Sequence, residues 1–465
     1  MSDYDYDLIC IGSGPAGQRA AVQAAKLGKR VAVVEKHQWV GGVCVEKGTI
    51  PSKTFREAVI SYTGYGRRFL PHQENTRGSR VPSEKLLQDV REVVRCELEI
   101  VERQLHRNGI DHRRGVASLE DVHTVRIESA SGSVLLNCDK ILIAVGSKPA
   151  QYEGPGLDHD VIVTSDDMPF LPNLPRTMAV IGAGVIGIEY ASIFATFGVK
   201  VFVVDKRRRL LEFIDHGIVD ELIRQMQAAG VVFHLEESVS SIDTVKDDRK
   251  YGVIQLESGR RIVCDTILYS AGRIGATDGL HLEKAGLEAD SRGRIQVNKF
   301  FQTRIPNIYA AGDVIGFPSL AATSSEQGRM ASRHAFKGET GGMAEHFPLG
   351  IYSVPEVSMV GKTENDLKKE NVQYETGIAR YSEIARGQIL GDDSGLFKML
   401  FDSKTRQLLG VHAIGTDATE LIHIGQAVLR LGGGLDYFLH TVFNYPTLAE
   451  CYKVAALNAE NKLSG

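Results

Sequence analysis

The stretch Gly12-Ser13-Gly14-Pro15-Ala16-Gly17 follows directly on the apolar run Leu8 to Ile11 and opens an alanine-rich segment that extends to Leu27. A second apolar run, Val31 to Val34, then ends in Glu35. This order predicts a strand, a glycine turn, a helix, and a second strand that ends in an acid. Glycines let the backbone approach a pyrophosphate at the helix N-terminus, and the acid accepts hydrogen bonds from ribose hydroxyls. The stretch therefore predicts a Rossmann-type unit that binds a dinucleotide.

The same pattern occurs a second time, at a constant offset of 170 positions. Gly182-Ala183-Gly184-Val185-Ile186-Gly187 follows the apolar run Met178 to Ile181, and Asp205 ends the run Val201 to Val204. A duplicated unit with only a structural role would not need the glycines and the acid twice. The repeat therefore predicts two dinucleotides bound to one chain at the same time.

Composition is that of an ordinary globular enzyme. The chain has 465 residues, of which 43% are hydrophobic and 24% charged, and this length predicts about three domains. The net charge of −4 gives no electrostatic reason to expect nucleic acid or an anionic membrane as partner. No apolar run reaches about 18 residues, so we expect no membrane span.

The cellular location is predicted from the N-terminus and the cysteines. The acidic start, Met1 to Asp7, runs at once into the first strand, which is not the pattern of a signal peptide. The six cysteines, at positions 10, 44, 96, 138, 264 and 451, show no framework spacing. We therefore expect reduced thiols in a cytoplasmic protein, and no metal site.

Further motifs extend the pattern along the chain. Residues 40–53 read Val-Gly-Gly-Val-Cys-Val-Glu-Lys-Gly-Thr-Ile-Pro-Ser-Lys, the run Ile141 to Val145 continues into Gly146-Ser147-Lys148-Pro149, and the run 308–311 ends in Gly312-Asp313. With the two glycine motifs, these stretches make the chain resemble the pyridine nucleotide-disulphide oxidoreductases of the lipoamide dehydrogenase and glutathione reductase type. The resemblance covers essentially the whole chain.

The resemblance implies an α/β fold with two Rossmann-like dinucleotide-binding domains, one for FAD and one for NAD(P), and a C-terminal α+β dimerisation domain. The expected boundaries are 1–149 for the FAD-binding domain, 150–271 for the NAD(P)-binding domain, 272–345 for the return to the FAD or central domain, and 346–465 for the interface domain. The interface domain implies a homodimer, and a larger homo-oligomer stays open.

The family's motifs also imply the cofactor-binding residues. Those expected to bind FAD are Gly12, Gly14, Pro15, Ala16, Gly17, Glu35, Lys36, Gly42, Val43, Cys44, Lys53, Val116, Ala144, Val145, Gly146, Gly312 and Asp313. Those expected to bind NAD(P) are Gly182, Gly184, Val185, Ile186, Gly187, Glu189, Asp205, Lys206, Arg207 and Gly272. On sequence alone, Asp313 could instead cap the helix expected to begin near Ser319.

Two charged positions match the hydride-transfer half of the family's site. Lys53, in Ile-Pro-Ser-Lys, and Glu189, two residues after Gly187, correspond to a lysine and a glutamate that pair beside the flavin N5. A cation at that place favours the anionic reduced flavin, and the carboxylate holds the lysine. The alternative is a solvated lysine and a surface acid without a shared role.

The dithiol half of the family's site is altered at two positions. The second cysteine of the redox pair is replaced by Thr49, and the histidine before the C-terminal Pro-Thr is replaced by Tyr445, while Glu450 keeps the place of the glutamate. A lone Cys44 cannot close a disulfide with its neighbour. Cys44 then has either a charge-transfer or redox-sensing role, or only a packing role.

Residues 205–209 combine opposing signals for the choice of nucleotide. Asp205 occupies the position that accepts a hydrogen bond from the adenosine ribose 2′-hydroxyl, which favours NAD. Lys206 and Arg207 begin a basic run, and a guanidinium near this position is how a 2′-phosphate is usually bound. We expect both NAD and NADP to bind, although the basic run could be a solvated turn and the enzyme specific for NAD.

Taken together, the chain is most similar to the soluble pyridine nucleotide transhydrogenases. The resemblance implies FAD-dependent hydride transfer between NADPH and NAD through flavin N5, in a ping-pong scheme without a redox disulfide. An NAD(P)H-dependent quinone or dye reductase of the same family is the main alternative. A lipoamide dehydrogenase-like enzyme and a flavin-containing sensor stay open as further alternatives.

Overall fold

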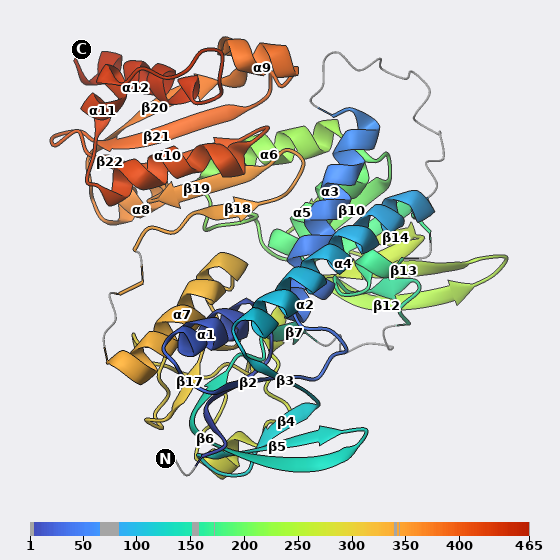
Figure 1. Ribbon diagram of the computed structural model, residues 1–465. Coiled ribbons are helices and arrows are strands. Elements are labelled where there is room, and N and C mark those ends of the chain that lie inside the picture. The colour runs from blue at the N-terminus through green and yellow to red at the C-terminus, as the bar shows by residue number, and fades with distance from the viewer. Residues whose placement is uncertain are drawn as a thin grey trace.

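The computed structural model describes residues 4–65, 83–150, 158–171, 173–338, 342–343 and 345–464. Figure 1 shows a lower unit built around α1 and β6, a second unit with α5 and β10 beside it, and a third with α10 and α12 above. The main sheets of the first two units are Rossmann-type, and the sheet of the third unit is antiparallel. The expected α/β class, with two dinucleotide-binding units and one α+β unit, is confirmed.

The first unit contains a sheet in which β3, β2, β1, β6 and β17 run parallel, while β6, β5 and β4 continue as an antiparallel extension. Its strands are β1 (Tyr6–Ile11), β2 (Val31–Glu35), β3 (Asp111–Arg114), β4 (Val116–Leu119), β5 (Thr124–Ser129), β6 (Gly132–Ile143) and β17 (Ile308–Ala310). Its helices are α1 (Pro15–Lys26), α2 (Gly42–Glu46), α3 (Thr49–Thr63), α4 (Ser83–Arg107) and α7 (Ala321–Lys337), with short 3-10 helices η2 (Leu282–Ala285) and η3 (Asp313–Ile315).

The second unit repeats this design in a smaller form. Five parallel strands lie in the order β11, β10, β9, β15, β8, and an antiparallel sheet of β12, β13 and β14 extends from it. The elements are β8 (Ile162–Val163), η1 (Met168–Phe170), β9 (Thr177–Ile181), α5 (Val185–Thr196), β10 (Lys200–Asp205), α6 (His216–Ala228), β11 (Val232–Leu235), β12 (Val239–Lys246), β13 (Lys250–Leu256), β14 (Arg261–Cys264) and β15 (Thr266–Tyr269). The chain enters and leaves this unit through the antiparallel pair β7 (Ser147–Pro149) and β16 (Arg273–Gly275).

The third unit is an antiparallel sheet in the order β18, β19, β22, β21, β20 with helices packed on it. The elements are β18 (Leu349–Ile351), β19 (Val357–Gly361), α8 (Glu364–Lys369), β20 (Tyr374–Arg380), η4 (Tyr381–Glu383), α9 (Ala385–Leu390), β21 (Leu396–Asp402), β22 (Leu408–Ile414), α10 (Ala418–Arg430), α11 (Leu435–His440) and α12 (Glu450–Leu463). One apolar cluster crosses from the second unit into this one: it joins Leu222 and Met226 of α6 to Met359 and Ile414 of the sheet.

Three expected elements differ slightly from those observed. The strand expected over residues 141–145 ends at Ile143, and the strand expected over 267–271 ends at Tyr269. In both places the chain soon turns at a glycine with positive φ, Gly146 (+68°) and Gly272 (+131°), which takes it out of the sheet. The helix expected near Ser319 begins at Ala321. The domain boundaries proposed from the sequence stay predictions.

Candidate functional site

The first glycine turn lets β1, β6 and α1 approach closely. A Cβ on Gly12 would lie 2.4 Å from the carbonyl oxygen of Ala144, the residue after β6, and one on Gly17 would lie 1.9 Å from the Gly12 carbonyl oxygen. Any side chain at either position would force these segments apart. Helix α1 then begins with Pro15 at its first turn, so its free N–H groups face the turn. This arrangement fits a pyrophosphate.

Glu35 closes the same turn from the end of β2. It is buried, and its Oε2 accepts hydrogen bonds from the Ser13 backbone N–H at 3.1 Å and from the Ser13 hydroxyl at 2.5 Å. Its Oε1 accepts from the His37 backbone N–H at 2.9 Å. The carboxylate is thus fixed at the carboxyl end of the parallel strands, where ligands of such sheets bind.

The second glycine turn has the same construction. A Cβ on Gly182 would lie 2.7 Å from the Ser270 carbonyl oxygen, and one on Gly187 would lie 2.1 Å from the Gly182 carbonyl oxygen. Asp205 takes the place of Glu35, since its Oδ2 accepts from the Ala183 backbone N–H at 2.6 Å. The repeat seen in the sequence is therefore also a repeat of hydrogen bonds.

Arg207 folds back onto Asp205. Its Nε and Nη2 donate to the two carboxylate oxygens at 2.9 and 2.7 Å, and its backbone N–H donates to Oδ1 at 2.8 Å. Burial alone would raise the pKa of Asp205, but the hydrogen bonds from Arg207 and Ala183 hold that pKa below its usual value. An acid and a guanidinium therefore share the place where an adenosine ribose would lie, while Lys206 is exposed next to them.

Lys53 and Glu189 meet between the first two units. The Lys53 Nζ lies 2.7 Å from the Glu189 Oε2, although α3 and α5 supply the two residues from distant parts of the chain. The other carboxylate oxygen of Glu189 accepts from the Tyr352 backbone N–H at 2.8 Å. The Tyr352 ring lies 5.1 Å from the Lys53 Nζ, close enough for a cation–π contact. The location of this pair beside a flavin stays a prediction.

Cys44 lies on the short helix α2, and Thr49 begins α3. Burial raises the pKa of the Cys44 thiol, and this effect exceeds the opposing effects of a hydrogen bond from Thr49 and the charge of Lys53. The thiol is therefore protonated at neutral pH. All six cysteines are free thiols.

Asp313 lies at the start of η3. Its Oδ2 accepts from the Ser147 hydroxyl at 2.7 Å, and the Arg273 Nε donates to that hydroxyl at 2.9 Å. The N-cap of α7 is Leu320, so the alternative in which Asp313 caps this helix is wrong.

The other expected binding residues fall into two groups. Most lie at the two turns or on the segments beside them; these are Gly14, Ala16, Gly42, Val43, Ala144, Val145, Gly146 and Gly312 around the first turn, and Gly184, Val185, Ile186 and Gly272 around the second. Lys36 and Val116 lie on the surface, and Val116 is 53% exposed at the start of β4. Their expected contacts with FAD stay predictions.

Tyr445 and Glu450 lie apart from the residues above. Tyr445 is 72% exposed, and Figure 1 shows the α11 and α12 region that flanks it well away from α2. Glu450 begins α12, and among the described residues its Oε2 is a buried oxygen without a hydrogen-bond partner. Within one chain, therefore, neither Tyr445 nor Glu450 lies near Cys44 or Lys53.

Three neighbours of the site were not anticipated from the sequence. Tyr352 contacts both members of the Lys53–Glu189 pair, Ser13 holds Glu35, and the Gln327 side chain accepts from the Gly312 backbone N–H at 2.8 Å. Ser13 lies inside the glycine motif, so its place was visible there. Tyr352 and Gln327 reach the site only through long-range packing, which the motifs do not encode.

Comparisons with known proteins agree with this geometry. The family model described as pyridine nucleotide-disulphide oxidoreductase matches residues 6–328, and the dimerisation domain of the same family matches residues 347–456. None of the helices in the described part of the chain is long and apolar enough to cross a bilayer.

Among curated relatives, a protein from Mycobacterium bovis (strain BCG / Pasteur 1173P2) named soluble pyridine nucleotide transhydrogenase is 48% identical over 461 residues, covering 99% of this chain and 98% of that protein. A protein of the same name from Shigella flexneri is 43% identical over 466 residues and covers 99% of each chain.

Among solved structures, the HOCl-induced flavoprotein disulfide reductase RclA from Escherichia coli matches with a TM-score of 0.87 and 27% identity, covering 97% of this chain and 99% of that one. LpdA from Mycobacterium tuberculosis, at 24% identity and a TM-score of 0.89, shares the fold. The two glycine turns, their acids, and the full-length family matches lead to one conclusion: the chain belongs to the pyridine nucleotide-disulphide oxidoreductase family.

Proposed function

We propose that this chain is an FAD-dependent soluble pyridine nucleotide transhydrogenase that transfers hydride between NADPH and NAD. The family to which it belongs uses FAD together with pyridine nucleotides. The names of its full-length relatives support the specific activity. The observation that carries the proposal is the intact Lys53–Glu189 ion pair beside a site where Thr49 stands in place of the second redox cysteine.

The two glycine turns would divide the cofactors between them. The turn at Gly12, with Glu35 and Asp313, would hold FAD, and the turn at Gly182, with Asp205, would hold the nicotinamide nucleotide. Bound FAD would supply a two-electron store for a hydride. Because only one turn remains for NADPH and NAD, the two nucleotides would use it in succession, which is a ping-pong scheme.

The residues of the chain would support this transfer by charge and position. Lys53 would present a fixed cation where negative charge develops, and Glu189 would hold the lysine at 2.7 Å. The Cys44 thiol is protonated at neutral pH because burial raises its pKa, so it would not serve as a nucleophilic thiolate. The scheme therefore needs no disulfide.

Assembly and location follow the family and the thiols. The match to a dimerisation domain supports a homodimer. A larger homo-oligomer is the alternative. Six free cysteines are in keeping with a cytoplasmic protein.

Steady-state kinetics test the function directly. The purified flavoprotein should reduce thio-NAD with NADPH, and double-reciprocal plots at several NADPH concentrations should give parallel lines, as ping-pong kinetics require. Lipoamide should give negligible turnover. Rapid reduction of a quinone without reduction of thio-NAD would favour a quinone or dye reductase and reject the proposal.

A further inference from the structure

The loop that follows Asp205 is fixed at both ends. Residues 206–214 connect β10 to α6 and carry the exposed basic run Lys206 to Arg209. At one end, Asp205 holds Arg207 by three hydrogen bonds. Between the basic run and α6 lies a shallow hollow of about 190 Å³, lined in part by Arg208, Arg209 and Ile223. Asp220 of α6 also lines this hollow, and its Oδ1 lies 3.6 Å from the Arg209 Nη1, so the position of α6 affects where the Arg209 side chain lies.

The other end of the loop is held by a residue of the third unit. Asp215 is the N-cap of α6 and is only 1% exposed; its Oδ1 accepts from the Gly217 backbone N–H at 3.1 Å and from the Lys398 Nζ at 2.9 Å. Lys398 lies on β21, is 5% exposed, and comes from 183 positions further along the chain. The contact joins the nucleotide-binding unit to the antiparallel sheet.

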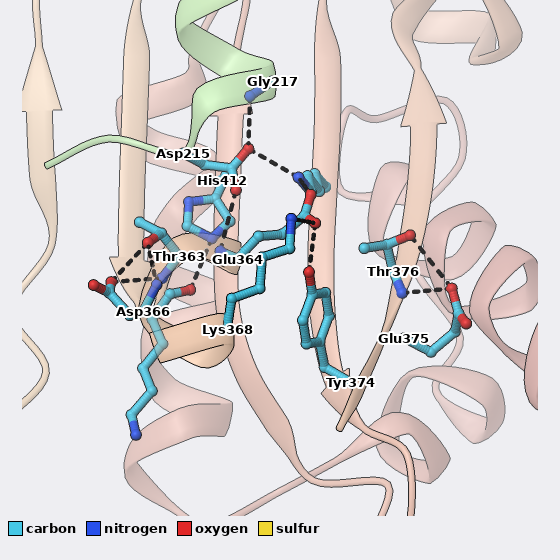
Figure 2. A network of polar contacts seen from close by, with 12 residues as sticks. Asp215, Gly217, Thr363, Glu364, Asp366, Lys368, Tyr374, Glu375, Thr376 and His412 are labelled. Carbon is cyan, nitrogen blue, oxygen red and sulfur yellow. Dashed lines mark hydrogen bonds and ion pairs between the residues drawn. The ribbon is translucent and has the colours of Figure 1, made fainter. Parts of the chain in front are cut away.

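Further side chains complete this buried network, which Figure 2 shows at the N-terminus of α6. Glu364, at the start of α8, contacts the Lys398 Nζ, and its backbone N–H donates to the Asp215 Oδ2 at 3.4 Å. The Tyr374 hydroxyl donates to the Glu364 Oε2 at 2.6 Å. His412, beside Lys398 on β22, is fully buried, and its Nε2 donates to the Lys362 carbonyl at 3.0 Å.

Buried ion pairs are poor sources of net stability, because desolvation of the two charges offsets much of their attraction. Their best-attested use is to fix one arrangement of elements among several, since a displaced partner leaves a charge buried and unpaired. The apolar contacts between α6 and the sheet are non-directional. The hydrogen bonds of the Asp215–Lys398 pair have defined directions, so they fix the position of the helix more narrowly.

We propose that Asp215 and Lys398 are positioning residues that select for the 2′-phosphate of NADP(H). Lys398 of the third unit binds Asp215 and thereby fixes the N-terminus of α6. The loop before α6 then holds the basic run Lys206 to Arg209 in position to bind a phosphate. The inference rests on the proposed function, in which this loop faces the adenosine ribose. Asp205 is anchored separately, by the Ala183 backbone N–H at 2.6 Å, so recognition of a 2′-hydroxyl does not depend on the pair.

The test uses the FAD-loaded full-length enzyme and two ligands that carry the adenosine end alone, 2′,5′-ADP and 5′-AMP. The variant is the double substitution Asp215→Asn with Lys398→Met, which removes both charges together and leaves asparagine, a good N-cap. The matched control is Asp265→Asn. Asp265 accepts hydrogen bonds from the backbone N–H groups of Arg176 and Thr177. It lies at the N-terminal ends of β9 and β15, away from the glycine turn of the same sheet.

Isothermal titration should show the Kd of 2′,5′-ADP raised about tenfold in the double variant, the effect of weakening one charge-assisted contact, with the Kd of 5′-AMP changed by less than about twofold. Asp265→Asn should change neither. The milder variant Glu364→Gln should also raise the Kd of 2′,5′-ADP, by a smaller factor. This variant replaces the double variant in the test if the double variant loses its flavin.

Two outcomes would overturn the inference. One is an equal change for both ligands, or no change for either, in variants that keep the flavin. The other is a wild-type enzyme that does not distinguish 2′,5′-ADP from 5′-AMP. A separate result would reject only the proposed function: wild-type enzyme that binds 2′,5′-ADP tightly but whose flavin NADPH does not reduce. In that case the shift in 2′,5′-ADP affinity still supports the positioning role.

Discussion

Lys53 is the residue on which the proposed hydride transfer depends most. Its ammonium group is held by Glu189 at 2.7 Å and covered by the Tyr352 ring at 5.1 Å, so its position is fixed from two sides before any ligand binds. A charge that is already in place costs no reorganisation when negative charge develops beside it. This is the physical basis for the first prediction.

Replacing Lys53 by methionine should slow reduction of the flavin by NADPH about a hundredfold, the effect of removing roughly 3 kcal/mol of electrostatic stabilisation from the barrier. Stopped-flow absorbance of the flavin measures the rate directly, and saturation with NADPH separates it from binding. Lys200→Met, which removes a lysine from the surface of β10, is the control and should leave the rate unchanged. An unaltered reduction rate in Lys53→Met would place the lysine outside the reacting site.

Cys44 is the second residue whose role can be tested, this time by pH. Because burial raises the pKa of its thiol above the ordinary value, the protonated form persists through neutral pH and the thiolate becomes populated only in the alkaline range. The oxidised enzyme should therefore show no thiolate-to-flavin charge-transfer band at pH 7. Alkylation of Cys44 by iodoacetamide should accelerate only in the alkaline range.

Cys44→Ser should keep most of the transhydrogenase activity, and dithionite titration of wild-type enzyme should consume two electrons per FAD, since no disulfide takes a second pair. Loss of nearly all turnover in a flavin-loaded Cys44→Ser protein would give the thiol an essential role, contrary to this account.

At the scale of elements, helix ends and their following loops carry most of the proposed specificity. Helix α1 begins at a glycine turn, and α7 crosses it so closely that a Cβ on Gly328 would lie 2.0 Å from the Ala16 carbonyl oxygen. Gly312, the residue before Asp313, also lies against α1, since a Cβ on it would lie 3.2 Å from the Ala16 Cβ. In the second unit, the loop 206–214 follows Asp205, and its basic side chains are exposed. The two turns therefore differ in what lies beside them.

This difference gives a prediction for the loop. Replacing Lys206 and Arg207 together by alanine should raise the KM for NADPH about tenfold or more while changing the KM for NADH little, because a 2′-phosphate loses its cations. Asp205→Ala should act in the opposite sense, since it removes the acceptor for the 2′-hydroxyl and a negative charge that repels phosphate. Initial-rate kinetics with each nucleotide measure both effects, and equal effects on the two nucleotides would exclude this loop from cofactor choice.

At the scale of the whole molecule, the third unit connects to both nucleotide-binding units. The segment 352–354 binds α3 and α5: the Arg56 Nε donates to the Ser353 carbonyl at 2.9 Å, and the Val354 backbone N–H donates to the Ser192 hydroxyl at 3.0 Å. The same unit exposes Val442 and Tyr445 almost fully in the single chain, with exposed fractions of 94% and 72%. Both residues lie within the part of the chain that matches the dimerisation domain of the family, residues 347–456, which supports burial of this surface by a second subunit.

We accordingly expect a homodimer in solution. Native mass spectrometry of the flavoprotein should give a mass near twice that of the 50.9 kDa chain, with one FAD per chain. Tyr445→Asp, which puts a charge into the covered surface, should weaken the dimer. Phe170→Asp, at an aromatic residue outside the third unit that is 55% exposed, should not. A stable monomer at micromolar concentration would contradict the expectation.

The sequence alone determined the features that depend on residues close together along the chain. Both glycine turns, their terminal acids and the α/β class could be predicted because strand, turn and helix form from contiguous residues with a recognisable period. The missing second cysteine at Thr49 was likewise a local observation. Lys53 and Glu189 could be named from their places in motifs.

The tertiary structure alone decided which distant residues meet. Tyr352 beside Lys53, Gln327 beneath Gly312, and Lys398 against Asp215 are contacts between elements that pack together from far along the chain. Such contacts depend on how whole helices and sheets pack against each other. A shift of one element by one residue would leave every local motif intact and would separate the partners. For this reason the sequence analysis identified Lys53 and Gly312, but it identified neither their partners Tyr352 and Gln327 nor the Asp215–Lys398 pair.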